Sequence, residues 1–176
     1  LGLDQDVVEA ACREASAKSP CQIANDNGGG KLVISGTKAG VEDAARLCTE
    51  RGAKRAIMLP VSAPFHSALM APAAERMRAA LAKAAIKAPV VPVVSNVAVQ
   101  PLTDPKEIRA RLVEQVTGRV RWRETVEWFG ANGIDTLYEI GSGKVLSGLA
   151  RRINREITTI SIGSPADVEA VLSTLG

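Results

Sequence analysis

The chain contains one histidine, His66, in a segment that reads Pro-Val-Ser-Ala-Pro-Phe-His-Ser-Ala-Leu-Met from residue 60 to residue 70. The segment lies where a predicted strand gives way to a predicted helix. Histidine is the side chain best suited to proton transfer near neutral pH, so a catalytic role is one interpretation. A structural histidine that makes a hydrogen bond is the other, and the remainder of the chain has to distinguish the two.

A histidine that acts as a base needs a nucleophile to deprotonate and a third group to fix its tautomer. In serine acyltransferases and hydrolases the nucleophile sits in a G-x-S-x-G turn between a strand and a helix. No serine of this chain has glycine at both the second position before it and the second position after it. Ser67 is adjacent to His66, which is poor geometry for attack assisted by that histidine. If His66 is catalytic, its nucleophile is therefore expected outside this chain.

Two glycine-rich segments are further candidates for binding. Gly141-Ser-Gly-Lys144 follows a predicted strand and opens a predicted helix, as phosphate-binding loops do, but it lacks the spacing of a Walker A or dinucleotide motif. A tight turn is the simpler interpretation. Asn25-Asp-Asn-Gly-Gly-Gly30 is typical of a hairpin turn, and its asparagine amides could also contact a ligand.

The elements that position these residues fall into two parts. The first part has the order β-α-β-β-α-β, which is that of a ferredoxin-like unit. Its second helix is expected to be capped by Thr37. Its strands are predicted at residues 1–3, 21–24, 31–35 and 54–59, and its helices at about 4–16 and 37–52.

After His66 the pattern changes to alternating helices and strands, which indicates a parallel sheet covered on both faces. Asp104 and Ser164 are expected to cap helices. Further helices are predicted over 72–85 and around Trp122–Phe129 and Val145–Ile153, and strands over 90–95, 136–140 and 157–162. The expected fold class is α/β, with a small subdomain at 1–62 followed by part of an α/β core at 63–176.

Composition excludes several classes of protein. The 176 residues carry a net charge of +3, which is too weakly basic to indicate nucleic-acid binding. The predicted strands also lack the aromatic pattern of an RNA-binding sheet. Cys12, Cys21 and Cys48 have no zinc-ligand spacing and suggest reduced thiols in the cytoplasm. No apolar run is long enough to cross a membrane.

Four segments in order resemble the malonyl-CoA:acyl carrier protein transacylase family of fatty acid synthesis. They are Asn25-x-Asn27 with Val33–Gly36, Gly52–Arg55 with Pro60–Met70, Pro92–Asn96, and Glu139–Gly148. The resemblance covers essentially the whole chain. It implies an α/β-hydrolase-like core into which the ferredoxin-like subdomain is inserted.

The resemblance also implies a mechanism. A serine attacks the malonyl thioester, His66 takes its proton, and the acyl-serine passes the malonyl group to the phosphopantetheine thiol of acyl carrier protein. The other ring nitrogen of His66 would be held by a backbone carbonyl, which falls at Arg121. Substrate contacts are expected at Asn27, Lys54, Arg55 and Phe65, and Phe65 would bear on the choice of acyl group. No metal and no cofactor are expected.

The serine and the arginine that pairs with the malonyl carboxylate are not found in this sequence, so the chain is expected to be a C-terminal portion, inactive alone. The expected partners are malonyl-CoA and acyl carrier protein, and the expected form is a cytoplasmic monomer that binds neither nucleic acid nor membranes. Two alternatives stay open: an acyltransferase domain of a polyketide or multifunctional synthase, and a non-catalytic module that docks the carrier protein.

Overall fold

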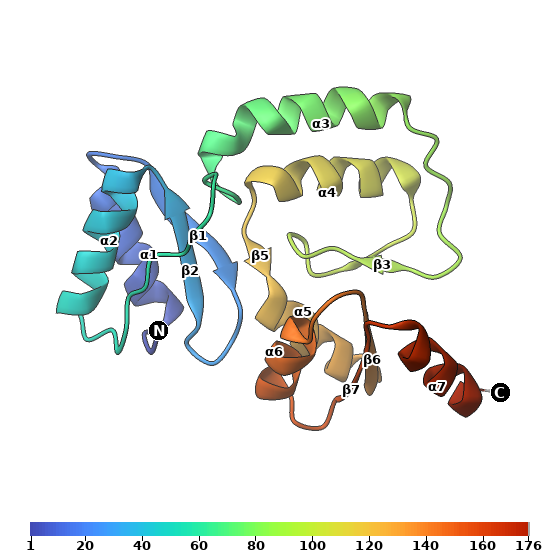
Figure 1. The fold of residues 1–176 in the computed structure, drawn as a ribbon. Coiled ribbons are helices and arrows are strands. Elements are labelled where there is room, and N and C mark those ends of the chain that lie inside the picture. The colour runs from blue at the N-terminus through green and yellow to red at the C-terminus, as the bar shows by residue number, and fades with distance from the viewer. Residues whose placement is uncertain (176) are drawn as a thin grey trace. The chain divides into compact units, whose positions relative to one another are not determined.

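The computed structural model describes residues 1–175, apart from the side chain of Leu175, and confirms the α/β class (Figure 1). The chain divides into two compact units, Leu1–Thr125 and Val126–Gly176. The first unit contains α1 (Gln5–Ser16), β1 (Cys21–Asp26), β2 (Leu32–Gly36), α2 (Lys38–Glu50), the 3-10 turn η1 (Ala68–Met70), α3 (Ala71–Lys83), β3 (Val93–Val94), β4 (Pro101–Leu102), α4 (Pro105–Thr117) and β5 (Val120–Arg121). Helix α5 (Trp122–Ala131) begins in the first unit, and the second contains β6 (Thr136–Ile140), α6 (Val145–Ile153), β7 (Thr158–Ile162) and α7 (Pro165–Leu175).

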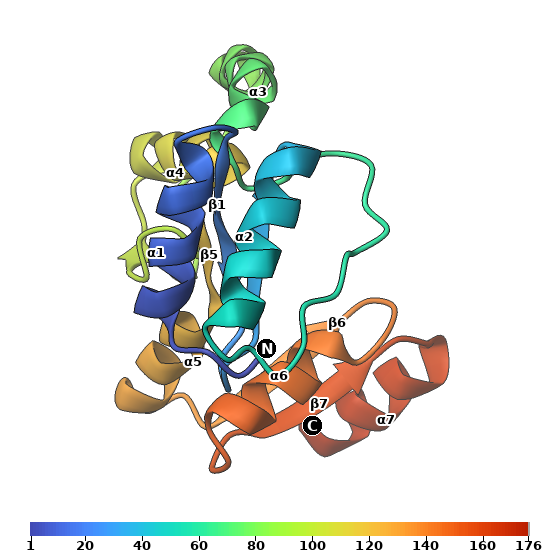
Figure 2. The ribbon, with the colours of Figure 1, turned by 90° about the vertical axis from the view of Figure 1, so that its left-hand side faces the viewer.

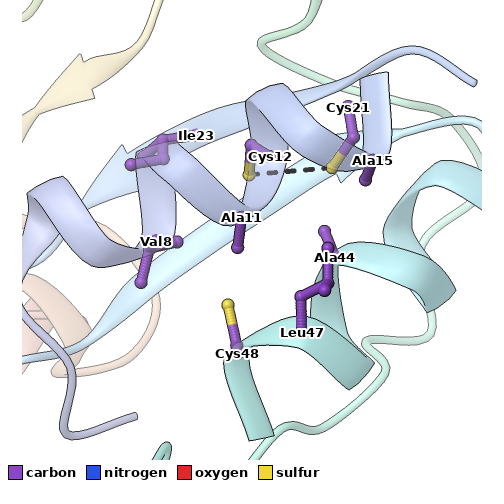
Figure 3. Packing of buried hydrophobic residues seen from close by; sticks show 9 residues of the cluster. All are labelled: Val8, Ala11, Cys12, Ala15, Cys21, Ile23, Ala44, Leu47 and Cys48. Carbon is purple, nitrogen blue, oxygen red and sulfur yellow. Dashed lines mark hydrogen bonds between the residues drawn. The ribbon is translucent and has the colours of Figure 1, made fainter. Parts of the chain in front are cut away.

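The first four elements of unit one pack together as two helices on a pair of strands, and this group is called here the four-element layer (residues 5–50). Strands β1 and β2 pair in antiparallel fashion around the predicted turn, and α1 and α2 lie side by side on one face of them (Figures 1 and 2). Small side chains let the helices approach the strands closely, and Cys12 Sγ lies 3.8 Å from Cys21 Sγ within this core (Figure 3). The core consists of Val8, Ala11, Cys12, Ala15, Cys21, Ile23, Ala44, Leu47 and Cys48.

The other edge of β1 pairs with β5, which runs parallel to it, so the sheet order is β2-β1-β5. Asp26 at the end of β1 is buried and accepts a hydrogen bond from Arg123 Nε at 2.8 Å. Helices α3 and α4 lie side by side (Figure 1). In unit two, β6 and β7 pair in parallel and α6 connects them.

Helix caps confirm several of the sequence predictions. Thr37 Oγ1 accepts from the Gly40 amide at 3.1 Å and starts α2. Asp104 Oδ1 accepts from the Lys106 amide at 2.9 Å and starts α4. Ser164 Oγ accepts from the Asp167 amide at 3.3 Å at the start of α7. These signals are local, which is why the sequence predicts them well.

The two outer strands of the predicted ferredoxin-like unit do not form. The segment from residue 53 to residue 66, called here the open segment, has no regular secondary structure, and Figure 2 shows it running as an extended ribbon from α2 towards α3. Its apolar residues Ile57, Met58 and Leu59 are 58%, 56% and 52% exposed. A strand requires a hydrogen-bonded neighbour. Leu1 makes main-chain hydrogen bonds to Lys54 and Arg55, but no strand of the described residues pairs with residues 56–66.

The strand predicted over 90–95 is also much shorter than expected, since only Val93 and Val94 pair, with Pro101–Leu102 of β4. Val90 and Val91 are exposed rather than buried. The subdomain boundary expected after residue 62 stays a prediction. Of the helices in the part of the chain that the structure describes, none has the length and apolar character needed to cross a bilayer.

Candidate functional site

His66 lies at the end of the open segment, immediately before the turn η1 that leads into α3. Its backbone is left-handed, with φ of 55°, a conformation that is uncommon for a residue other than glycine. The side chain is half-buried, and its Nδ1 lies 2.9 Å from the backbone carbonyl oxygen of Gln115 in the last turn of α4. The imidazole is therefore fixed by contact with an element 49 positions away in the sequence.

This contact sets the tautomer of the neutral ring. A carbonyl oxygen can only accept a hydrogen bond, so Nδ1 must carry the proton in the Gln115 contact. The unprotonated nitrogen of the neutral ring is then Nε2. This is the arrangement that a histidine needs to act as a base through Nε2.

The loop that carries His66 is attached to β1 through Gln22. The Oε1 atom of Gln22 accepts from the Ala68 amide at 3.0 Å, and its Nε2 donates to the His66 carbonyl at 3.2 Å. The same Nε2 donates to the Thr117 carbonyl at 3.3 Å, at the end of α4. Ser67 lies between His66 and Ala68, the two residues of the loop that Gln22 binds. It is 2% exposed, and its Oγ donates to the Pro64 carbonyl at 2.7 Å.

His66 lines a groove of about 940 Å³ between the hairpin and the open segment. Three of the predicted substrate residues, Asn27, Arg55 and Phe65, also line this groove. Phe65 is 48% exposed and therefore presents part of its ring to a ligand. Lys54 is exposed but is not among the lining residues. The structure thus brings His66 together with three of its four predicted neighbours.

The prediction that the Arg121 carbonyl orients His66 is wrong. The Arg121 carbonyl accepts from Thr125 Oγ1 at 2.9 Å, and Arg121 pairs with Asp26 in the parallel ladder of β5 and β1. The guanidinium of Arg121 pairs with Glu124, and that hydrogen bond lowers the pKa of the Glu124 carboxyl. The orienting carbonyl is instead that of Gln115, because the end of α4, rather than β5, lies against the histidine loop.

The glycine-rich loop Gly141–Lys144 leads into α6, and a carboxylate of this chain already occupies amides at the start of that helix. The carboxylate of Glu139 already accepts from the amides of Leu146 at 3.0 Å and Ser147 at 2.8 Å, at the N-terminus of α6. Hydrogen bonds from Ser147 and Leu146 lower the pKa of Glu139, so the carboxylate stays ionised at neutral pH. A phosphate would have to displace this negative charge from the same amides.

Two residues of the site, Gln22 and Gln115, were not predicted from the sequence. Gln115 acts through its backbone carbonyl, and no side-chain pattern marks a carbonyl. Gln22 is a polar residue between buried Cys21 and Ile23 on β1, and that alternation indicates only that its side chain leaves the core. Within residues 1–175 no three His, Cys, Asp or Glu side chains are grouped so that they could hold a metal ion.

Curated relatives cover almost the whole chain. The malonyl CoA-acyl carrier protein transacylase of Salmonella typhimurium is 44% identical over 173 residues, which is 98% of this chain and 56% of that protein. The enzyme of the same name from Bacillus subtilis is 43% identical over 176 residues, or 99% of this chain and 56% of that protein. No protein-family model matches the chain.

Solved structures agree with these relatives. An acyl-carrier-protein-S-malonyltransferase from Bartonella henselae is 56% identical, with a TM-score of 0.95 over 100% of this chain and 56% of that one. A malonyl-transacylase in complex with the acyl-carrier protein of a type II polyketide synthase is 38% identical, with a TM-score of 0.93 over 99% of this chain and 56% of that one.

The chain spans about half the length of the curated relatives that it matches. The identity and the agreement in structure extend over nearly every residue that it contains. Along almost its whole length, the chain is therefore similar to a segment that makes up 56% of a malonyl CoA-acyl carrier protein transacylase.

Proposed function

We propose that this chain supplies the acid–base histidine and part of the substrate groove of a malonyl-CoA:acyl carrier protein transacylase. The observation that carries the proposal is the imidazole of His66, whose Nδ1 is fixed on the Gln115 carbonyl at 2.9 Å beside a groove of about 940 Å³. This contact leaves Nε2 unprotonated in the neutral ring, and Nε2 is the atom that takes the proton.

The nucleophile in this proposal is a serine outside residues 1–176, since the chain contains no G-x-S-x-G turn. The serine oxygen attacks the thioester carbonyl of malonyl-CoA as its proton passes to His66 Nε2. The C–S bond then breaks, the proton passes to the sulfur, and CoA leaves as a thiol. The phosphopantetheine thiol attacks the acyl-serine by the same steps, so malonyl transfer needs no cofactor beyond the two substrates.

The groove supports the substrate assignment. Asn27 and Phe65 lie along it, where an amide and an aromatic ring can contact an acyl-thioester chain. Arg55 lines it, and Lys54, the preceding residue, is exposed, so both cations are available to CoA phosphates or to an acidic carrier protein. A related transacylase is known in complex with an acyl-carrier protein, which supports a carrier protein as the partner here. In this proposal the protein is a cytoplasmic monomer.

The ferredoxin-like subdomain at 1–62 and the α/β-hydrolase-like core at 63–176 are part of the same proposal. Leu1 donates from its amino group to the Arg55 carbonyl at 2.8 Å, and Lys54 donates to the Leu1 carbonyl at 2.9 Å. These two bonds support a pairing of the outer strands. The exposed apolar side chains of Ile57, Met58 and Leu59 support a further strand neighbour that residues 1–176 do not supply.

The test uses a complete transacylase in which this chain is joined to the additional segment that its longer relatives contain. In that protein, His66→Ala and His66→Asn are compared with the unchanged sequence. Malonyl transfer to holo acyl carrier protein should fall about 10²–10⁴-fold in kcat, because the general base is lost. Carrier-protein affinity should not change. Transfer at the full rate in either variant would contradict the proposal and favour a module that only docks the carrier protein.

A further inference from the structure

We infer that Gln22 is a positioning residue that holds His66 in its base-competent orientation; this inference deepens the proposed function and rests on it. Gln22 lies in the middle of the sheet on β1 and reaches the histidine loop with both ends of its amide. It accepts from the Ala68 amide at 3.0 Å and donates to the His66 carbonyl at 3.2 Å. No contact of Gln22 with the imidazole itself is involved.

The loop depends on this attachment. His66 is left-handed, a conformation that is held only where its surroundings determine it. The open segment before it belongs to no strand or helix. Gln22 binds the residue on each side of Ser67, and Ser67 is 2% exposed, so the two bonds fix the peptide units on either side of a buried residue.

Gln22 also fixes the acceptor of the imidazole. Its Nε2 donates to the Thr117 carbonyl at 3.3 Å, two residues after Gln115, whose carbonyl holds His66 Nδ1. One side chain thus ties the residue that carries the imidazole to the helix end that orients it. A change at Gln22 is therefore expected to lengthen or misalign the contact between Nδ1 and the Gln115 carbonyl.

Only an amide satisfies all three contacts. Two carbonyls require a donor and one backbone amide requires an acceptor, and glutamine provides both groups at a fixed separation. Gln22→Glu keeps the acceptor for Ala68 but places a carboxylate oxygen against the carbonyls of His66 and Thr117. Gln22→Ala removes all three bonds. The two variants therefore separate loss of the donor from loss of the whole attachment.

Gln100 supplies the matched control. It is an exposed glutamine of the same unit, and its Nε2 donates to Glu107 Oε1 at 3.0 Å, with no bond to the histidine loop. Gln100→Ala removes the same atoms as Gln22→Ala. It should leave both the imidazole and the transfer reaction unchanged.

The first measurement is independent of activity. His66 is the only histidine, so labelling with 15N-histidine gives the two ring-nitrogen signals of a single imidazole in the chain itself. At a pH where the ring is neutral, the unchanged chain should show a protonated Nδ1 and an unprotonated Nε2. Gln22→Ala and Gln22→Glu should show a mixture of both tautomers. Folded Gln22 variants with the unchanged spectrum would overturn the inference.

Where neither variant folds, hydrogen exchange in the unchanged chain decides the question. The Ala68 amide and the Gln22 side-chain amide should both exchange more slowly than they do in unfolded peptides, because each is hydrogen-bonded. If both exchange at the unfolded rate, the attachment does not exist and the inference fails.

The second measurement is malonyl transfer in the complete protein described above. Both Gln22 variants should lower kcat about 10- to 100-fold with little change in KM, because a misplaced base slows the chemical step without removing substrate contacts. An unchanged kcat in Gln22 variants, alongside a large loss in His66→Ala, would overturn the positioning role alone. If His66→Ala has no effect, the proposed function fails, and the tautomer measurement still tests whether Gln22 orients the ring.

Discussion

The four-element layer and the open segment follow each other in the chain, but the first buries its apolar residues and the second exposes them. In the layer, Leu47 is 7% exposed and Ala44 is fully buried. In the open segment, Leu59 is 52% exposed and Val61 is 63% exposed. The layer buries its core with helices and strands that are close in sequence, whereas no element of the described residues covers the apolar side chains of the open segment. Burial here follows from the presence of a partner element and not from hydrophobicity alone.

The largest effect should come from shortening the same side chain in each region. Leu47→Ala should lower the free energy of unfolding by about 2–5 kcal/mol, because it leaves a cavity in the core. Leu59→Ala should change it by less than about 0.5 kcal/mol, because the side chain is already half in water. Urea unfolding followed by circular dichroism measures both. Equal losses for the two variants would mean that the open segment is covered.

A smaller effect is expected where the layer is too tight for one added carbon. A Cβ on Gly36 would lie 2.1 Å from the Pro20 carbonyl oxygen and 2.7 Å from the Cys21 Cα, so Gly36→Ala must push β1 and β2 apart. We expect a loss of about 1–3 kcal/mol in the free energy of unfolding, the usual cost of overpacking.

Gly148 in α6 is the control for Gly36, because a Cβ there meets no atom within 4 Å beyond its chain neighbours and the backbone of its own helix. Gly148→Ala should stabilise the protein by about 0.5–1 kcal/mol, since alanine is the better helix former. A neutral Gly36→Ala would contradict the close packing of the layer.

The smallest effect concerns a third region, the loop before α6. Glu139, near the end of β6, spans this loop by accepting hydrogen bonds from the first amides of α6. Hydrogen bonds from Ser147 and Leu146 lower the pKa of Glu139 from its ordinary value of 4.5, so the ionised form is favoured by folding. Its contribution to stability is present above pH 4.5 and is lost as the pH falls through the lower folded-state pKa.

Glu139→Ala should therefore lower the melting temperature at pH 7, and the difference from the unchanged chain should shrink as the solution is acidified towards pH 3. Glu169→Ala, at an exposed position on α7, is the control and should alter the melting temperature little at either pH. A Glu139→Ala difference that is the same at both pH values would show that the carboxylate charge is not what closes the loop.

The sequence predicts what local chemistry determines. Thr37, Asp104 and Ser164 begin helices as expected, because a cap involves residues only two or three positions apart. The strand expected over 54–59 is missing, because strand formation depends on a neighbour and not on the apolar residues of the segment alone. Local patterns thus predict helices better than strands in this chain.

The same distinction between local and long-range interactions applies to the site. His66 and three groove residues were predicted through the resemblance of whole segments. Gln22 was missed because its bonds join residues 44 and 95 positions apart, and Gln115 was missed because its carbonyl acts without any side-chain signal. The misassignment to Arg121 arose from the same source, since the choice between two backbone carbonyls depends on tertiary structure.

The attachment made by Gln22 has a consequence for how this sequence can change over time. All three of its hydrogen bonds go to main-chain atoms, of His66, Ala68 and Thr117. The side chains at positions 68 and 117 can therefore be replaced by mutation without removing a partner of Gln22, whereas position 22 has no equivalent freedom. Selection that preserves His66 would therefore restrict position 22 on β1. Through these bonds it would not restrict which side chains stand at positions 68 and 117.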